Sequence, residues 1–295
     1  MPIIKNVDRL NLFREDAAGH VSTLEQLQQQ YGIDPAGTNF YFGINDLNLQ
    51  NFNATGTALN PTDQDFFDKL QASLAASADA EKTLQLGVEP PETPNPYAFV
   101  TANLDMVRQL AADLAGEQGK ARANGKTLSI AVRYASEMND GGQSQGNDPV
   151  GYKTTFAQVR QAFAENAPSI PLSFAPALRA DLPEALIGQY WPGDDLVDII
   201  GGTWYVGSPA QRAASFGNMR AYFLHRTGSG KPFALSEMGG CETNAAGQGT
   251  NNDAVLEQMV GELEALQSQG VSFTYVTIFL ASKWGADATL RFLRS

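Results

Sequence analysis

Two glutamates stand out as residues that could do chemistry, because each follows a β-rich run. Glu137 comes where the run in SIAVRYASEMND gives way to a loop, and Glu237 has the same place in KPFALSEMGG. Two carboxyl groups in unlike environments can cleave a glycosidic bond: one donates a proton to the leaving oxygen, and the other attacks the anomeric carbon or activates water. The alternative is that they are two solvated acids among 32.

The elements that must position these glutamates alternate regularly along the chain. Predicted strands cover residues 9–13, 39–44, 83–88, 128–134, 170–174, 197–204, 232–235 and 271–280. Predicted helices cover residues 22–30, 62–76, 97–115, 154–165, 182–188, 209–224 and 253–267. Eight strands alternating with helices indicate an α/β fold, a (β/α)8 TIM barrel forming a single domain over residues 1–295. A doubly wound open sheet with one extra unit is the alternative.

The connecting segments also favour a barrel enzyme. Those after the strands are long and polar, such as residues 45–61 and 138–151, whereas those after the helices are mostly short. Barrel enzymes place their sites on the loops that follow the strands. Because strands 4 and 7 lie across the barrel axis, we expect Glu137 and Glu237 to face each other over a cleft. A separation of about 5–5.5 Å would give retention of anomeric configuration, and about 6.5–9.5 Å inversion.

Composition excludes several classes of protein. With 43% hydrophobic and 18% charged residues, the chain of 295 residues is typical of a folded globular protein. A net charge of −12 argues against a nucleic-acid partner or an anionic membrane and is compatible with a neutral substrate. The single cysteine, Cys241, excludes an intramolecular disulfide, and no apolar run is long enough to span a membrane. Charges throughout residues 1–16 are not typical of a secretory signal, which leaves open a cytoplasmic protein or one whose leader was removed.

Other catalytic constellations are weak. The two histidines, His20 and His225, make a Ser-His-Asp triad improbable, and no cluster has zinc-ligand spacing. The GSGK at residues 228–231 precedes proline and lacks the first glycine of a phosphate-binding loop, so it is interpreted as a turn. The sequence therefore predicts no metal and no cofactor.

Three segments resemble motifs of the clan A glycoside hydrolases, most closely family 26, the β-mannanase-like enzymes. VRYASEMND resembles the strand-4 motif that bears that family's acid/base, and KPFALSEMGG resembles the strand-7 motif that bears its nucleophile. YWPGDDLVDIIGGTWY, residues 190–205, resembles the Tyr-Tyr-Pro-Gly-Asp motif that leads through strand 6, and is the most specific match. The resemblance is clear over residues 128–280.

The resemblance implies a retaining, endo-acting hydrolase of β-linked polysaccharide that needs no cofactor. Glu137 would be the acid/base and Glu237 the nucleophile. Tyr205 would hydrogen-bond and orient the nucleophile, and Arg133 would hold the charge of the site. The implied partner is a polysaccharide or oligosaccharide, and we expect a monomer.

One departure from the family concerns substrate choice. Ser136 precedes the acid/base, where the family has His and most of the clan has Asn, a residue that normally contacts the sugar. The serine side chain is shorter than that of His or Asn and does not extend as far. We therefore expect a divergent relative acting on a different polysaccharide, such as a bacterial exopolysaccharide. A carbohydrate-binding barrel without activity, and a polysaccharide lyase, are the alternatives.

Aromatic residues near strand ends could stack on apolar sugar faces. For Trp204 and Trp284, beside the ends of strands 6 and 8, sugar contact and core packing are both open. Tyr205 and Tyr134 are further candidates, whereas Trp191, before a Pro-Gly turn, is more typical of packing.

Overall fold

The computed structural model describes residues 9–15, 26, 29, 36–43, 59, 61–77, 79–141, 146–206, 211–239, 241–243, 249–251 and 253–281. The chain divides into two compact units. Unit 1 comprises Met1–Asn39, Ala175–Gln189 and Ile199–Ser295, and unit 2 comprises Phe40–Phe174 and Tyr190–Asp198. Each unit is described by itself.

The sheet of unit 2 is built from parallel strands. β3 (Glu81–Glu89) pairs with β4 (Thr127–Tyr134) in unbroken register from Glu81 opposite Thr127 to Val88 opposite Tyr134. β4 continues the sheet to β5 (Leu172–Phe174), and β2 (Gly37–Gly43) ends in this unit. Residues 82–88 of β3 are all buried, as expected for a parallel strand covered on both faces.

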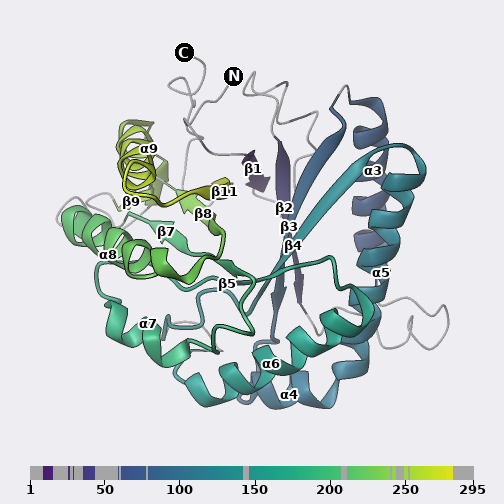
Figure 1. The fold of residues 1–295 in the computed structure, drawn as a ribbon, viewed down its shortest axis with the longest axis horizontal. Coiled ribbons are helices and arrows are strands. Elements are labelled where there is room, and N and C mark those ends of the chain that lie inside the picture. The colour runs from purple at the N-terminus through teal and green to yellow at the C-terminus, as the bar shows by residue number, and fades with distance from the viewer. Residues whose placement is uncertain are drawn as a thin grey trace. The chain divides into compact units, whose positions relative to one another are not determined.

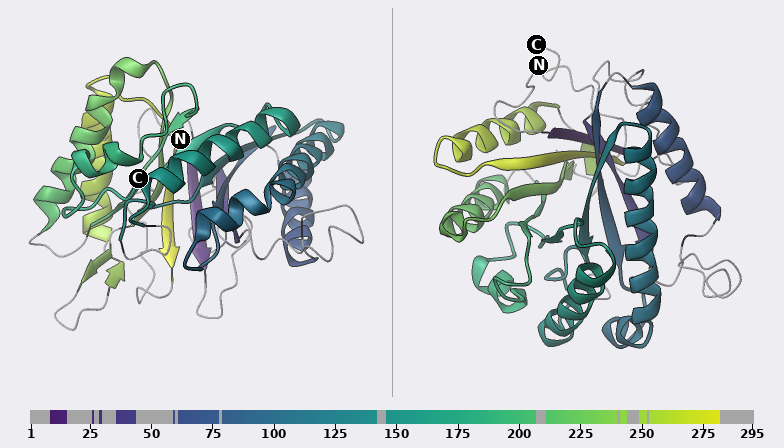
Figure 2. Two further views of the ribbon diagram at one scale, coloured as in Figure 1. Left: turned by 90° about the horizontal axis from the view of Figure 1, so that it is seen from below. Right: turned by 45° about the vertical axis from the view of Figure 1, so that its right-hand side comes forward.

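In the described part of unit 2 the helices are α3 (Pro61–Ala76), α4 (Pro96–Ala102), α5 (Leu104–Ala123) and α6 (Pro149–Asn166). α5 lies against β4, with α3 and α6 on either side of it (Figures 1 and 2). Its apolar positions recur at helical spacing, and Met106, Leu110 and Leu114 are buried. α6 begins after Asp148, whose carboxylate caps the helix by accepting from the Gly151 N–H, 2.8 Å away.

Unit 1 also has a parallel sheet, in which β11 (Phe273–Ala281) pairs with β1 (Arg9–Glu15) and with β8 (Phe233–Gly239). β6 (Ile199–Ile200) and β7 (Thr203–Tyr205) pair with β8 on its other side. β9 (Cys241–Thr243) and β10 (Gly249–Asn251) form a separate antiparallel pair. The helices with described bounds in this unit are α7 (Glu184–Tyr190), α8 (Arg212–His225), the short 3-10 helix η2 (Thr227–Ser229) and α9 (Asp253–Gln267).

Three elements of the sequence prediction need correction. The predicted strand at residues 197–204 is two short strands, because the chain breaks at Gly201–Gly202, where a Cβ on Gly202 would lie 2.5 Å from Leu178 Cδ1. The predicted helix at residues 97–115 is two helices separated at Asn103. Strand β8 extends to Gly239, so Glu237 lies within a strand and not at the start of a loop.

The remaining predicted strands and helices correspond to observed elements wherever the structure describes them. The predicted helix at residues 22–30 lies outside the described residues except for Gln26 and Gln29, which are helical.

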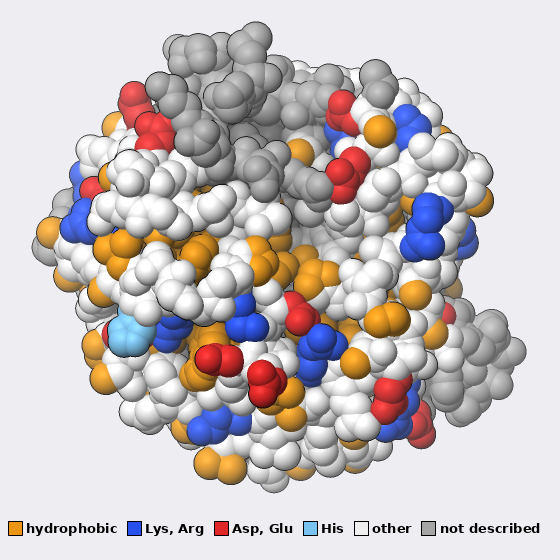
Figure 3. Space-filling view, in the orientation of Figure 1, with side chains coloured by type: hydrophobic (Ala, Val, Ile, Leu, Met, Phe, Trp, Pro, Cys, Tyr) orange, Lys and Arg blue, Asp and Glu red, His pale blue; other side chains and the backbone are white. Residues whose placement is uncertain are grey.

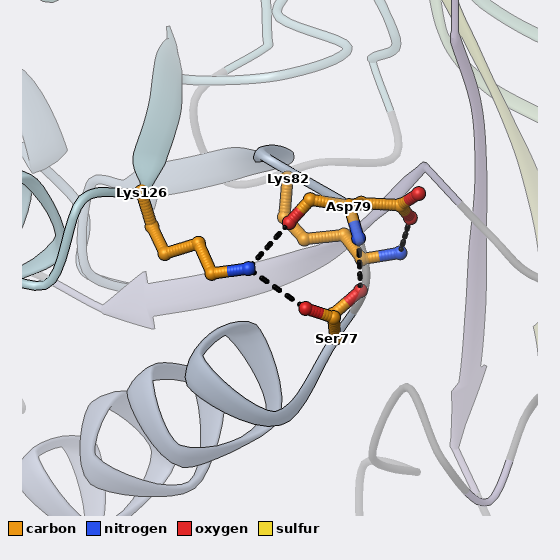
Figure 4. Close-up of polar contacts among 4 residues, drawn as sticks. All are labelled: Ser77, Asp79, Lys82 and Lys126. Atoms are coloured by element: carbon orange, nitrogen blue, oxygen red, sulfur yellow. Dashed lines mark hydrogen bonds and ion pairs between the residues drawn. The ribbon is translucent and has the colours of Figure 1, made fainter.

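Hydrogen bonds link the start of β4 to the connection between α3 and β3 (Figure 4). Lys126 Nζ donates to the carbonyls of Ser77 and Asp79, 2.7 and 2.9 Å away. Lys82, which is buried, places its ammonium 2.7 Å from the carboxylate of Asp79. These bonds hold the amino-terminal ends of β3 and β4 together.

We expect Lys126→Met to lower the free energy of unfolding by about 1–2 kcal/mol, because two carbonyls lose a charged donor. The control is Lys69→Met, which removes only the exposed pair with Asp65 and should cost about 0.5 kcal/mol or less. Chemical denaturation followed by circular dichroism measures both. An equal loss of unfolding free energy in the two variants would contradict the stabilising role of Lys126.

Within the described part of the chain, no helix has the length and hydrophobicity that crossing a membrane requires. On the face drawn in Figure 3, Lys and Arg side chains lie among Asp and Glu side chains and do not gather into one broad patch.

Candidate active site

Glu137 follows β4 in a tight, unusual turn of unit 2. The strand ends at Tyr134, and the next residues include Ala135 and Glu137 with φ of 48° and 55°. The left-handed region costs a residue with a side chain about 1–2 kcal/mol, so surrounding contacts must hold this turn. The Ala135 N–H donates to the Val88 carbonyl at 3.0 Å, and the Asp140 N–H donates to the Glu137 carbonyl at 2.8 Å.

Arg133, the second-to-last residue of β4, places a buried positive charge just before this turn. Its Nη2 donates to the hydroxyl of Tyr41 at 2.6 Å, and its guanidinium lies 5.0 Å from the centre of the Tyr41 ring. Gly87, opposite Arg133 in the register, gives the ring its space, since a Cβ there would lie 2.5 Å from Tyr41 Cδ1. Arg133 is thus held by an aromatic ring, and it lowers the pKa of a neighbouring carboxyl group, that of Glu89.

That carboxyl group, Glu89 at the end of β3, is the residue that sequence analysis missed. It accepts hydrogen bonds from the Ser136 N–H at 3.1 and 3.3 Å, and the Ser136 hydroxyl also donates to it. Burial raises the pKa of Glu89, the Arg133 charge and the two Ser136 donors lower it, and the nearby Glu137 carboxylate raises it further. A glutamate at the end of a strand was the signal that had singled out Glu137, and it applied equally to Glu89.

Glu237 lies in unit 1, on β8, and is 7% exposed. β7 runs beside it, with Thr203 opposite Glu237 in the register, and the Ser236 N–H donates to the Gly202 carbonyl at 2.8 Å. The hydroxyl of Tyr205, also on β7, donates a hydrogen bond to Oε2 of Glu237. Two neighbouring strands therefore fix a buried carboxylate and the donor that orients it.

Of the two tryptophans predicted to contact sugar, the structure describes Trp204 and not Trp284. Trp204 has no exposed surface: its indole N–H donates to Ser215 Oγ at 3.0 Å, and its ring packs edge-to-face on Phe216 at 5.0 Å. This placement corresponds to the packing alternative, and it leaves Trp204 no surface for sugar contact. Trp284 lies outside the described residues.

Two further aromatic residues also pack within unit 2. Trp191 lies edge-to-face with Phe174 at 5.0 Å and donates to Asp194 Oδ1 at 2.9 Å. Tyr134 is buried and donates to Thr155 Oγ1 at 2.9 Å, and burial raises its pKa. Among the residues that the structure describes, no three His, Cys, Asp or Glu side chains group as a metal site would require.

Parallel strands that alternate with helices are typical of the (β/α)8 TIM barrel class. Comparison with solved structures confirms that fold. The chain is similar to an endo-β-1,4-mannanase from Cellulomonas fimi, with a TM-score of 0.67 and 14% identity, covering 99% of this chain and 72% of that one.

Two other solved structures agree. A family 26 β-mannanase from Bacteroides ovatus gives a TM-score of 0.62 at 16% identity, covering 99% of this chain and 84% of that one. GH26C from a Muricauda species gives a TM-score of 0.64 at 16% identity, covering 94% of this chain and 80% of that one. No protein-family model matches the sequence, and no curated protein matches it.

Proposed function

We propose that this chain is a retaining glycoside hydrolase that cleaves internal bonds of a β-linked polysaccharide, with residues 1–295 forming one catalytic domain. The observation that carries the proposal is the buried carboxylate of Glu237, to which Tyr205 on the adjacent strand donates. Glu137, held just beyond β4, supplies the second carboxyl group. The similar solved structures, which include β-mannanases, support the same class of reaction.

In the first step, an oxygen of Glu237 attacks the anomeric carbon while Glu137 donates its proton to the glycosidic oxygen. The bond between the anomeric carbon and that oxygen breaks, the leaving sugar departs as an alcohol, and a glycosyl ester forms on Glu237. Tyr205 holds one carboxylate oxygen of Glu237, which leaves the other oxygen to attack.

In the second step, the Glu137 carboxylate removes a proton from water, whose oxygen attacks the same anomeric carbon. The ester bond to Glu237 breaks, and the carboxylate and the starting protonation of Glu137 are both restored. Two inversions give net retention. The chemistry requires two carboxyl groups and no metal or organic cofactor, and we propose that the protein performs it as a monomer.

For the substrate we propose a β-mannan or a related neutral β-glycan, including bacterial exopolysaccharides. In the structure the Ser136 hydroxyl donates to Glu89, and we propose that this bond takes the place of the sugar contact that the family's His makes. Arg133 is buried against Tyr41 and acts on the site through its charge. Sugar contact by Trp284 stays a prediction.

The test is a product profile from mannan, xylan, mixed-linkage β-glucan and bacterial exopolysaccharides, with heat-inactivated protein as the control. A ladder of saturated oligosaccharides from one polymer is the expected result. Products with an unsaturated terminal sugar would identify a lyase. Binding to a polymer without new reducing ends would identify a carbohydrate-binding barrel, and either outcome would contradict the proposal.

We expect Tyr205→Phe to lower kcat by about 10- to 100-fold with little change in KM, because one donor to a charged group is lost. The control is Tyr222→Phe, which removes a buried hydroxyl that donates to the Gly201 carbonyl and not to Glu237. Steady-state kinetics on the polymer identified above measures both. Equal kcat in Tyr205→Phe and wild type would contradict the orienting role.

A further inference from the structure

We propose that Glu89 is a positioning residue, which holds the turn at residues 135–137 through Ser136 and so aims the carboxyl group of Glu137. The inference deepens the proposed function and rests on Glu137 being the acid/base. All of the residues it uses belong to unit 2.

The strand register brings Glu89 to the turn. Val88 lies opposite Tyr134, the last residue of β4, and the Val88 carbonyl accepts from the Ala135 N–H at 3.0 Å. Continued by one residue, this register places Glu89 beside Ala135, and the Glu89 side chain reaches the following residue, Ser136. The parallel pairing thus continues past the end of β4 through a side chain.

The contact between Glu89 and Ser136 uses both donors of the serine. The N–H lies 3.1 Å from Oε2 and 3.3 Å from Oε1, and the hydroxyl donates to Oε1. A backbone donor and a side-chain donor on one carboxylate fix both the position and the rotation of the residue that carries them. Glu89 therefore fixes the Ala135–Ser136 peptide and the side chain of Ser136, the residue that precedes Glu137.

The turn needs such a restraint. Ala135 and Glu137, on either side of Ser136, have positive φ, and Asn147 is the only other non-glycine residue with positive φ in the described part of the chain. Two unfavourable conformations spaced two residues apart persist only where the surroundings impose them. The Glu89 carboxylate provides this restraint, because it accepts hydrogen bonds from Ser136, the residue between Ala135 and Glu137.

Charge places Glu89 next to the reacting group as well. Burial raises the pKa of Glu89 above its ordinary value; the Arg133 charge and the Ser136 donors oppose this rise, and the Glu137 carboxylate adds to it. Tyr97 and Tyr134 are also within electrostatic reach, since Glu89 raises the pKa of both. Glu89 and Glu137 are therefore neighbours by charge as well as by connectivity through Ser136.

The same two strands offer a matched control at their other end. Glu81, the first residue of β3, accepts from the hydroxyl of Ser129 on β4 at 2.5 Å. This pair has the same residue types and nearly the same sequence separation as Glu89 and Ser136, and it joins β3 to β4 itself, whereas Ser136 lies two residues beyond the end of β4. It lies at the amino-terminal ends of the strands, where barrel positions serve stability and not catalysis.

The kinetic test compares Glu89→Gln with Glu81→Gln on phenyl and 2,4-dinitrophenyl β-glycosides of the sugar that the wild type cleaves. Phenol needs a proton to leave and dinitrophenol does not, so a misplaced acid slows only the first substrate. For Glu89→Gln we expect kcat/KM to fall about 10- to 100-fold on the phenyl glycoside and about threefold or less on the dinitrophenyl glycoside. Glu81→Gln should match the wild type on both. Equal losses on the two substrates, or no loss on either, would overturn the proposal.

A second measurement does not depend on activity. Crystal structures of Glu89→Ala and Ser136→Ala should show the turn relaxed, with φ of Ala135 or Glu137 negative in the first and a smaller change in the second, which keeps the backbone N–H. An unchanged turn in Glu89→Ala would overturn the proposal. If the wild type cleaves no glycoside while the turn still relaxes, the proposed function fails and the role of Glu89 in placing Glu137 stands.

Discussion

The Glu237→Ala variant is expected to hydrolyse polysaccharide about 10⁴-fold more slowly than the wild type, or slower still, because the covalent intermediate can no longer form. The side chain is buried on β8 and hydrogen-bonded by Tyr205, so alanine leaves a small space and one donor without its acceptor. Release of reducing ends from the polymer measures the rate.

The control for this variant is Glu257→Ala, which removes an exposed carboxylate from α9 in the same unit. It should keep the activity and the unfolding temperature of the wild type. Activity of Glu237→Ala within about tenfold of the wild type, with the fold intact by circular dichroism, would remove Glu237 from the reaction.

The Glu137→Ala variant is expected to lose about 10²- to 10⁴-fold in polysaccharide hydrolysis, because the leaving sugar oxygen is no longer protonated. Its first step on a 2,4-dinitrophenyl glycoside should stay nearly as fast as in the wild type, since dinitrophenolate leaves without a proton. The second step should slow, because the base that activates water is gone. Pre-steady-state kinetics should therefore show a burst of dinitrophenolate followed by slow turnover.

The matched control is Glu92→Ala, an exposed glutamate in the loop that follows β3 in the same unit. It should behave as the wild type on both substrates. Equal losses of Glu137→Ala on polysaccharide and on the dinitrophenyl glycoside, without a burst, would show that Glu137 is not the acid/base.

Much of the fold was predictable because apolar runs and helical spacing are local signals. The strands 128–134 and 271–280 and the helix 253–267 match β4, β11 and α9 closely. The break at Gly201–Gly202 was not predicted; at this point Leu178, from a different segment of the chain, lies against Gly202, and such a tertiary contact leaves no local signal in the sequence. The length of β8 was also missed, since its last residues read as a turn until the pairing with β7 is known.

The site shows the same division between local and tertiary information. Sequence motifs identified Glu237 and Tyr205, and the structure places them in a hydrogen bond on adjacent strands. Glu89 escaped notice because its role depends on the register of β3 against β4, which places it beside Ser136. From the sequence, Trp204 could equally have contacted sugar or packed in the core. Only its contacts with Ser215 and Phe216 in the structure assign it to the core.

The account as a whole depends on Glu237 being the nucleophile of a two-step displacement, and the configuration of a rescued product tests this most directly. Glu237→Ala is incubated with a 2,4-dinitrophenyl β-glycoside of the sugar that the wild type cleaves, in the presence of azide, and the glycosyl azide is examined by proton NMR. Azide entering the space left by the carboxylate attacks the anomeric carbon from the opposite side to the leaving group, so the account predicts the α-glycosyl azide. A β-glycosyl azide, or undiminished hydrolysis without any azide product, would contradict it.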